Sequence, residues 1–82
     1  MPMPSREKTL EITDTLEEIA PGCGAMHNQF QNLSKISYVL YADVSVPTAL
    51  RSVSYLRSQG YEVREVYNED GTIMVYGELV CD

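Results

Sequence analysis

The stretch APGCGAMHNQF, residues 20–30, decides how the first half of the chain folds, because a proline and two glycines interrupt the sequence there. Residues 6–20 before it contain neither Gly nor Pro, and Pro21-Gly22 ends that segment. After it, apolar residues recur with the i, i+4, i+7 spacing of a helix face at Met26, Phe30 and Leu33. The sequence therefore predicts a corner between two helices, the second over residues 24–34.

Residues 6–20 form the first predicted helix, with Ser5 as its N-cap. On a helical wheel, one side carries the apolar residues Ile12, Leu16, Ile19 and Ala20. The opposite side carries four carboxylates, here called the acidic stripe: Glu7, Glu11, Asp14 and Glu18. This clean division favours a single helix. The alternative is a strand over residues 9–13, followed by a capping box that spans Asp14 and Glu17.

The second half of the chain predicts a strand, a helix and a hairpin. Residues 35–45 are rich in β-branched and aromatic residues, which favours a strand. Pro47 suits the first turn of a helix that ends at Gly60. The expected buried stripe of this helix consists of Val46, Ala49, Leu50, Val53 and Leu56. Residues 61–67 and 72–80 then form a hairpin around NEDG, residues 68–71.

The predicted fold is therefore α+β: two N-terminal helices followed by a βαββ unit, with a three-stranded sheet and the helices packed on one face. A chain of 82 residues suits a single small domain, 1–82, in which we expect residues 1–4 to be disordered. The sequence shows no internal repeat.

The chain is acidic, with 12 Asp and Glu residues against 6 Lys and Arg and a net charge of −6. This balance argues against direct binding of DNA, RNA or anionic lipid, which need clustered basic residues. No apolar run approaches the roughly 18 residues of a membrane span, and the first residues lack the pattern of a signal peptide. We therefore expect a cytoplasmic protein that binds a protein partner with a basic surface and makes no direct contact with nucleic acid or membrane.

Cys23 and His27 are the residues of the corner that suggest chemistry. At the start of the second predicted helix, the helix dipole favours a thiolate at Cys23, and His27 one turn later suits the role of its base. The alternative is that Cys23 is a small buried hydrophobe on the apolar side of that helix. A zinc site would need Cys23, His27, Cys81 and a further ligand such as Asp82, and a 23–81 disulfide is a third option. We favour the buried cysteine and expect no catalytic residue, metal or cofactor.

The acidic stripe is the first candidate binding surface. Its four carboxylates are spaced almost as densely along the helix as the phosphates of a DNA strand, so the stripe suits the basic groove of a nucleic-acid-binding protein. The alternative is a solvated helix face with no partner.

The second candidate surface is a sheet face, because so small a protein can cover only one face of its sheet with helices. Strand alternation predicts that the uncovered face exposes Val39, Tyr41, Arg64, Met74 and Tyr76. Tyr, Met and Arg are enriched in protein interfaces, so this face is expected to bind a partner or a second copy of the chain as a homodimer. The alternative is that these tyrosines merely border the core.

These observations predict a small acidic intracellular protein-binding protein, an inhibitor or adaptor that occupies a protein partner. Phage and mobile-element anti-CRISPR or anti-restriction proteins share this size and charge, which is an analogy and not a sequence match. The second hypothesis is a dimeric regulatory domain that binds a small molecule. The third is a thiol enzyme that uses Cys23 and His27.

Overall fold

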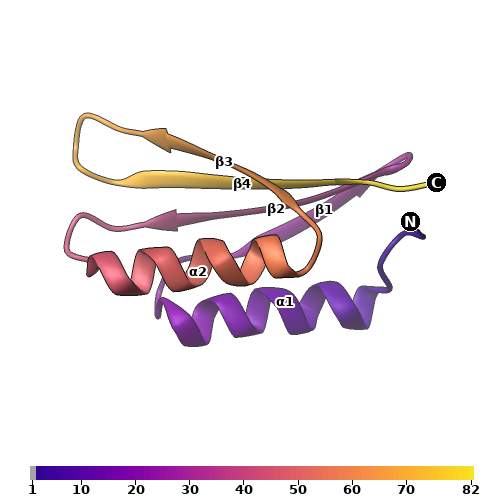
Figure 1. Cartoon of the computed structure of the whole chain (residues 1–82), viewed down its shortest axis with the longest axis horizontal. Helices are drawn as coiled ribbons and strands as arrows, with labels where there is room; N and C mark the ends of the chain where they lie inside the picture. The colour runs from indigo at the N-terminus through magenta and orange to yellow at the C-terminus, as the bar shows by residue number, and fades with distance from the viewer. Residues whose placement is uncertain (1) are drawn as a thin grey trace.

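The computed structural model describes residues 2–82, which form two helices and four strands (Figure 1). In chain order the elements are α1 (Arg6–Ile19), β1 (Met26–Phe30), β2 (Leu33–Leu40), α2 (Val46–Ser58), β3 (Glu62–Tyr67) and β4 (Ile73–Val80). The strands form one sheet in the order β1-β2-β4-β3, and every neighbouring pair is antiparallel. The fold is thus α+β, with the element order α-β-β-α-β-β.

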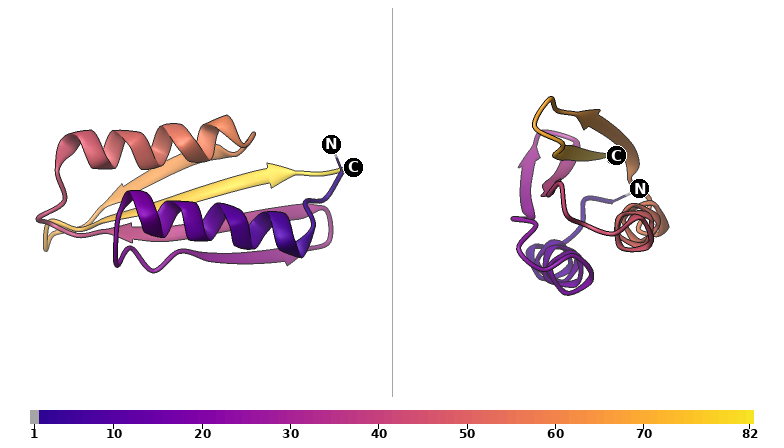
Figure 2. Two further views of the ribbon diagram at one scale, coloured as in Figure 1. Left: turned by 90° about the horizontal axis from the view of Figure 1, so that it is seen from below. Right: turned by 90° about the vertical axis from the view of Figure 1, so that its left-hand side faces the viewer.

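Both helices pack against the same face of the sheet, which curves around them (Figure 2). The core lies between the two layers and contains Leu16 of α1, Leu56 of α2 and Tyr38 and Val75 of the two central strands, each at most 1% exposed. The prediction that the helices share one face agrees with this arrangement. The opposite face of the sheet has no helix over it.

The predicted helix over residues 24–34 is wrong, and so is the three-stranded sheet. These residues form β1, a two-residue loop and the start of β2, so that the sheet has four strands. Met26 and Phe30 lie four residues apart, which fits one face of a strand as well as one face of a helix, since side chains alternate every two residues in a strand. Pairing settles the structure, because the long strand β2 offers hydrogen-bond partners along the whole length of β1.

The loop of this hairpin, Gln31-Asn32, carries no glycine to mark it. Gln31 has φ +55° and is the only non-glycine residue with a positive φ among the described residues. A positive φ at the first of two central positions alone is the pattern of a type II′ turn, where glycine is preferred. The turn could not be recognised from the sequence, because glutamine does not favour this conformation.

The other predicted elements are present, but the strand expected over residues 35–45 is shorter at its end, because β2 ends at Leu40 and residues 41–45 form the loop to α2. α1 is one continuous helix, which excludes the strand over residues 9–13, and the backbone N–H of Lys8 donates to Ser5 Oγ at 3.1 Å. The hairpin of β3 and β4 turns through Gly71 at φ +87°, and Gly60 follows α2 at φ +92°. In α2, however, Val46 and Leu50 are exposed, so the buried stripe is narrower than expected.

The chain consists of two structurally similar halves that the sequence did not reveal. Each half is a helix followed by a hairpin, and the second strand of each hairpin lies at the centre of the sheet, where β2 and β4 run antiparallel. The capping serines Ser5 and Ser45 are equivalent, as are the fully buried Leu16 and Leu56. With β4 moved in front of α1, the chain would have the β-α-β-β-α-β order of ferredoxin-like units.

The N-terminal segment touches the rest of the molecule before α1 begins. Met3 packs against the core, and the Gln29 side-chain amide donates to the Pro4 carbonyl at 2.9 Å. The disorder expected for residues 1–4 falls partly on residue 1, which lies outside the described residues.

The left-handed conformation of Gln31 gives a test of the β1–β2 hairpin. Because a side chain in this conformation costs about 1–2 kcal/mol and glycine adopts it freely, we expect Gln31→Gly to raise the free energy of unfolding by about 0.5–1 kcal/mol, the remainder being offset by the entropy of the unfolded glycine. Urea denaturation measures the change. The control is Asn32→Gly, which should give no gain because Asn32 does not have a positive φ. Equal effects of the two changes would contradict the hairpin.

Candidate functional site

The outer face of the sheet, the one without helices, carries apolar side chains from all four strands. They are Met26 and Phe30 of β1, Leu33 and Val39 of β2, Val66 of β3, and Met74, Tyr76 and Val80 of β4. Met26, Phe30 and Val80 are each at least 67% exposed. Single exposed apolar residues are ordinary, but apolar side chains spread over one whole face are typical of an interaction surface.

The register of the strands arranges this face in rows that run across the sheet. One end is an apolar row in which Val39 pairs with Met74 and Met74 with Val66. The other end is apolar as well, since Phe30 pairs with Leu33 and Leu33 with Val80. The face therefore has two apolar ends with polar and charged rows between them.

The middle rows carry the charges of the outer face. The guanidinium carbon of Arg64 lies 5.1 Å from the centroid of the Tyr76 ring, which is a cation–π geometry. In the next row, Lys35 Nζ lies 4.0 Å from Glu78 Oε1, and both side chains are about half exposed. These residues line a hollow of about 310 Å³ together with Met26 of β1. Cationic and aromatic groups at the centre of an apolar face are the composition of protein-binding surfaces.

The structure brings together four of the five residues predicted for this face: Val39, Arg64, Met74 and Tyr76. The fifth, Tyr41, lies just past the end of β2 and is 50% exposed. It borders a different hollow, of about 250 Å³, together with Pro21 and Asp43.

Sequence reasoning missed the contributions of β1 to the outer face, because residues 24–34 were assigned to a helix. The residues Met26, Asn28 and Phe30 are every second residue of β1, which is the spacing of one strand face. Their partners Ser37, Lys35 and Leu33 are every second residue of β2 and lie on the same face. Val66 and Val80 were not among the residues predicted for this face, although strand alternation from Arg64 and from Tyr76 reaches them.

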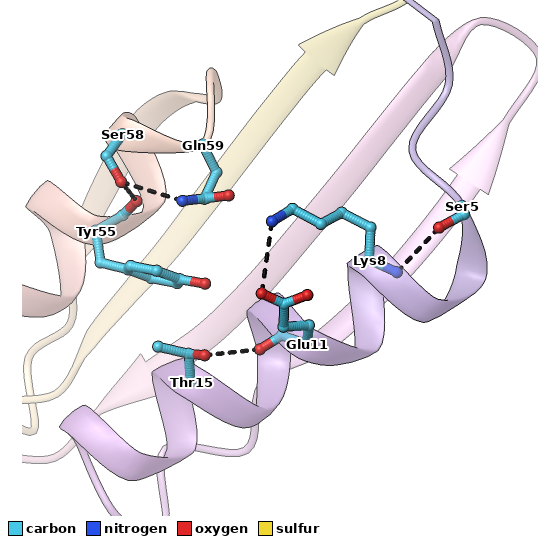
Figure 3. Close-up of polar contacts among 7 residues, drawn as sticks. All are labelled: Ser5, Lys8, Glu11, Thr15, Tyr55, Ser58 and Gln59. Carbon is cyan, nitrogen blue, oxygen red and sulfur yellow. Dashed lines mark hydrogen bonds and ion pairs between the residues drawn. The ribbon is translucent and has the colours of Figure 1, made fainter.

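The acidic stripe lies on the outer side of α1, and all four of its carboxylates are exposed. The buried residues of α1 are Thr9, Ile12, Thr13 and Leu16, which face the sheet. Only Glu11 of the stripe pairs with a cation in the described residues, with Lys8 Nζ at 3.6 Å (Figure 3). Figure 3 also shows the Tyr55 ring extending from α2 toward Glu11, so the stripe borders the seam between the helices.

The two predicted surfaces therefore lie on opposite sides of the molecule. The outer face belongs to the sheet layer and the acidic stripe to the helix layer (Figure 2). Even the shortest extent of the molecule, 17 Å, is about two screening lengths at physiological ionic strength. One flat partner surface cannot contact both at once.

Cys23 directly follows the exposed turn Pro21-Gly22 and does not lie at a helix N-terminus. It is 1% exposed, which confirms the prediction that it faces the core. Burial raises the pKa of the Cys23 thiol to about 11, and the nearby Glu17 carboxylate adds to this rise. Glu17 also accepts a hydrogen bond from the Ala25 N–H at 2.8 Å, which ties the turn to α1. The helix dipole invoked for a reactive thiolate is absent, because β1 follows instead of a helix.

The two cysteines lie at opposite ends of β2. The Val39 N–H donates to the Cys23 carbonyl, whereas the Cys81 N–H donates to the Asn32 carbonyl. Asn32 and Val39 are seven residues apart, about 23 Å along a strand. Both thiols are free. A 23–81 disulfide and a zinc site that joins these two cysteines are therefore wrong.

Neither related proteins nor a cluster of metal ligands identifies a function for the chain. No protein-family model matches the chain, and no curated protein is significantly similar to it. In residues 2–82, no three His, Cys, Asp or Glu side chains are grouped as metal ligands would be. Neither helix in this part of the chain has the length and apolar character needed to cross a bilayer. The function must be argued from the surfaces.

The environment of Cys23 predicts slow chemistry. In a Cys81→Ser background, iodoacetamide at pH 8 should label Cys23 of the folded protein far more slowly than Cys23 of the urea-unfolded protein, because the native thiol is buried and its pKa is raised. Mass spectrometry follows the labelling. Similar rates for the folded and unfolded protein would contradict the buried thiol and favour a reactive site.

Proposed function

We propose that the chain is a small acidic protein-binding protein, an inhibitor or adaptor, that docks on a protein partner through the outer face of its sheet. The observation that supports this proposal best is the placement of both helices on one face, which leaves apolar side chains of four strands without a cover. Burying such a face removes apolar area from water at roughly 25 cal/mol per Å² before the costs of association.

The composition of the outer face supports a protein partner over a nucleic acid. Its two cations, Lys35 and Arg64, already face Glu78 and the Tyr76 ring. Aromatic sheet faces that bind RNA need basic surroundings, whereas the net charge here is −6. Tyr, Met, Phe and Arg together on one face instead match the composition of interface cores.

The charge of the chain suits a partner with a basic surface, and we place the encounter in the cytoplasm. Because the acidic stripe lies on the far side of the molecule, its role in docking through the outer face is long-range steering, which raises the association rate at low ionic strength, where screening is weak. An inhibitor that approaches a nucleic-acid-binding protein in this way would cover its target with the sheet and be attracted by its charge.

The central test is a Tyr76→Glu variant. The chain, immobilised, captures its partner from a lysate of the cells that encode it, and mass spectrometry identifies the partner. With purified partner, Tyr76→Glu should weaken affinity about tenfold or more, since a carboxylate would be buried in the interface. Val80→Glu changes an exposed position of the same face and should also weaken affinity. This second variant replaces Tyr76→Glu in the test if Tyr76→Glu disturbs folding.

The matched control for this test is Leu10→Glu, which introduces the same carboxylate at an apolar residue of α1 that is 42% exposed and belongs to the helix layer. It should leave affinity for the partner unchanged. If Tyr76→Glu and Val80→Glu fold by circular dichroism and bind as tightly as the wild type, the outer face is not the docking surface.

The acidic stripe gives a separate prediction. The double change Glu11→Lys, Asp14→Lys should alter the free energy of unfolding by less than about 1 kcal/mol, because both side chains are exposed. It should slow association with the partner at low salt and leave the dissociation rate unchanged, because the stripe steers without touching. Surface plasmon resonance at two salt concentrations separates the rates. A faster dissociation would show instead that the stripe lies in the interface.

A further inference from the structure

The apolar stripe of α2 is wider than the core that it covers. Val53 and Leu56 are buried, but Val46 is 71% exposed and Leu50 is 63% exposed. On a helical wheel, Val46 and Leu50 lie on the same flank as Val53, next to the buried side. Tyr67, at the end of β3, is 72% exposed. Three of the most exposed large apolar side chains in the described residues thus lie near one another, at a place separate from the outer face.

These three side chains border a groove between α2 and the β3–β4 hairpin, with a volume of about 270 Å³. Buried or partly buried residues of the core, Leu40, Val53 and Ile73, form its floor. α2 and β3 are joined through Gly60 and diverge toward the other end, where Val46 and Tyr67 lie (Figure 1). The residues that line the groove come from the first part of α2 and the last part of β3, away from Gly60 in both elements.

A free strand edge runs beside this groove. β3 is the last strand of the sheet and pairs with β4 alone, so alternate N–H and C=O groups along its other side have no partner strand. A strand added to such an edge gains backbone hydrogen bonds, and every second side chain points into the neighbouring groove. The edge and the groove together have the two parts that recognition by strand addition needs.

The groove carries one charged side chain, Glu65, whose carboxylate accepts a hydrogen bond from the Tyr67 hydroxyl at 2.8 Å. Glu69 and Asp70 lie in the loop of the hairpin, which directly follows Tyr67 of the groove. An occupant therefore meets apolar walls with negative charge at one end.

We propose that the groove between α2 and β3 binds an extended apolar segment of a partner protein, which adds to the sheet as a fifth strand next to β3. The segment places alternate apolar side chains against Val46, Leu50 and Tyr67, and its Lys or Arg residues lie toward Glu69 and Asp70. This site is separate from the outer face, so one chain can hold two protein surfaces at once, as an adaptor does.

The test uses a phage-displayed library of random twelve-residue peptides, selected on the immobilised full chain. The enriched peptides should alternate apolar and polar residues and carry a basic residue at one end. A synthetic peptide of the most enriched sequence is then titrated against variants by fluorescence polarisation. Leu50→Glu should weaken binding about tenfold or more, because it puts a carboxylate into the apolar wall.

The matched control is Leu10→Glu, which makes the same change at an exposed leucine of α1. It should bind the peptide like the wild type, as should Tyr76→Glu of the outer face. Failure of this proposal is thereby distinct from failure of docking through the sheet. Absence of any enriched peptide, or equal affinities of Leu50→Glu and the wild type, would overturn the proposal.

Hydrogen exchange locates the bound peptide on the sheet. Amide protons on the free side of β3 should exchange more slowly when the peptide is bound, while those of β1, the other edge, should not change. Protection at β1 instead of β3 would contradict the proposal. So would self-association of the free chain that Leu50→Glu abolishes, because the groove would then belong to a second copy.

Discussion

The arrangement of the two layers depends on the contact between Gly77 of β4 and Leu56 of α2. A Cβ atom at Gly77 would lie 2.7 Å from Leu56 Cδ2 and 3.3 Å from Tyr61 Cβ, closer than carbon atoms pack. The missing side chain lets Leu56 reach the middle of a central strand, where it is fully buried. α2 is therefore held on the inner face of the sheet, beside α1, and neither helix is left to cover the outer face.

The buried polar groups between these layers form hydrogen bonds with one another or with the backbone. The Tyr38 hydroxyl donates to Ser52 Oγ at 3.2 Å, and the hydroxyls of Ser34 and Tyr61 share a hydrogen bond of 2.8 Å. Every buried side-chain nitrogen and oxygen atom in residues 2–82 has a partner. The chain therefore needs no further molecule to satisfy its core. The exposed apolar surface, on the outer face and beside α2, is not used in folding, and this surface is the observation on which the proposal of protein binding rests.

Much of this fold could be predicted from local patterns. Ser5, Pro47, Gly60 and Gly71 mark the ends of elements through capping or turn chemistry, and each lies where the sequence indicated. The β1–β2 hairpin could not be predicted in this way, because Gln31 takes a conformation that its residue type disfavours. A single wrong element changed the number of strands and removed β1 from the predicted outer face.

The candidate surfaces differ in how much of each could be predicted from the sequence. The acidic stripe depends only on helical periodicity, and its exposure was readable from the sequence. The position of Tyr41 could not be read, because alternation stops where β2 ends at Leu40. The exposure of Val46 and Leu50 was hidden as well, since a helical stripe shows which residues are apolar but not how much of them the sheet reaches.

The central claim is that residues 26–30 form an edge strand and that the outer face of the sheet is open. Nuclear Overhauser effects in the free protein test both parts at once. We expect cross-strand effects between the backbones of Met26 and Ser37, and effects from the Tyr76 ring to Arg64 and Ser37 but to no residue of either helix. Two results together would contradict the edge strand and the open face: sequential Overhauser effects typical of a helix over residues 24–34, and effects that place this helix over the Tyr76 ring.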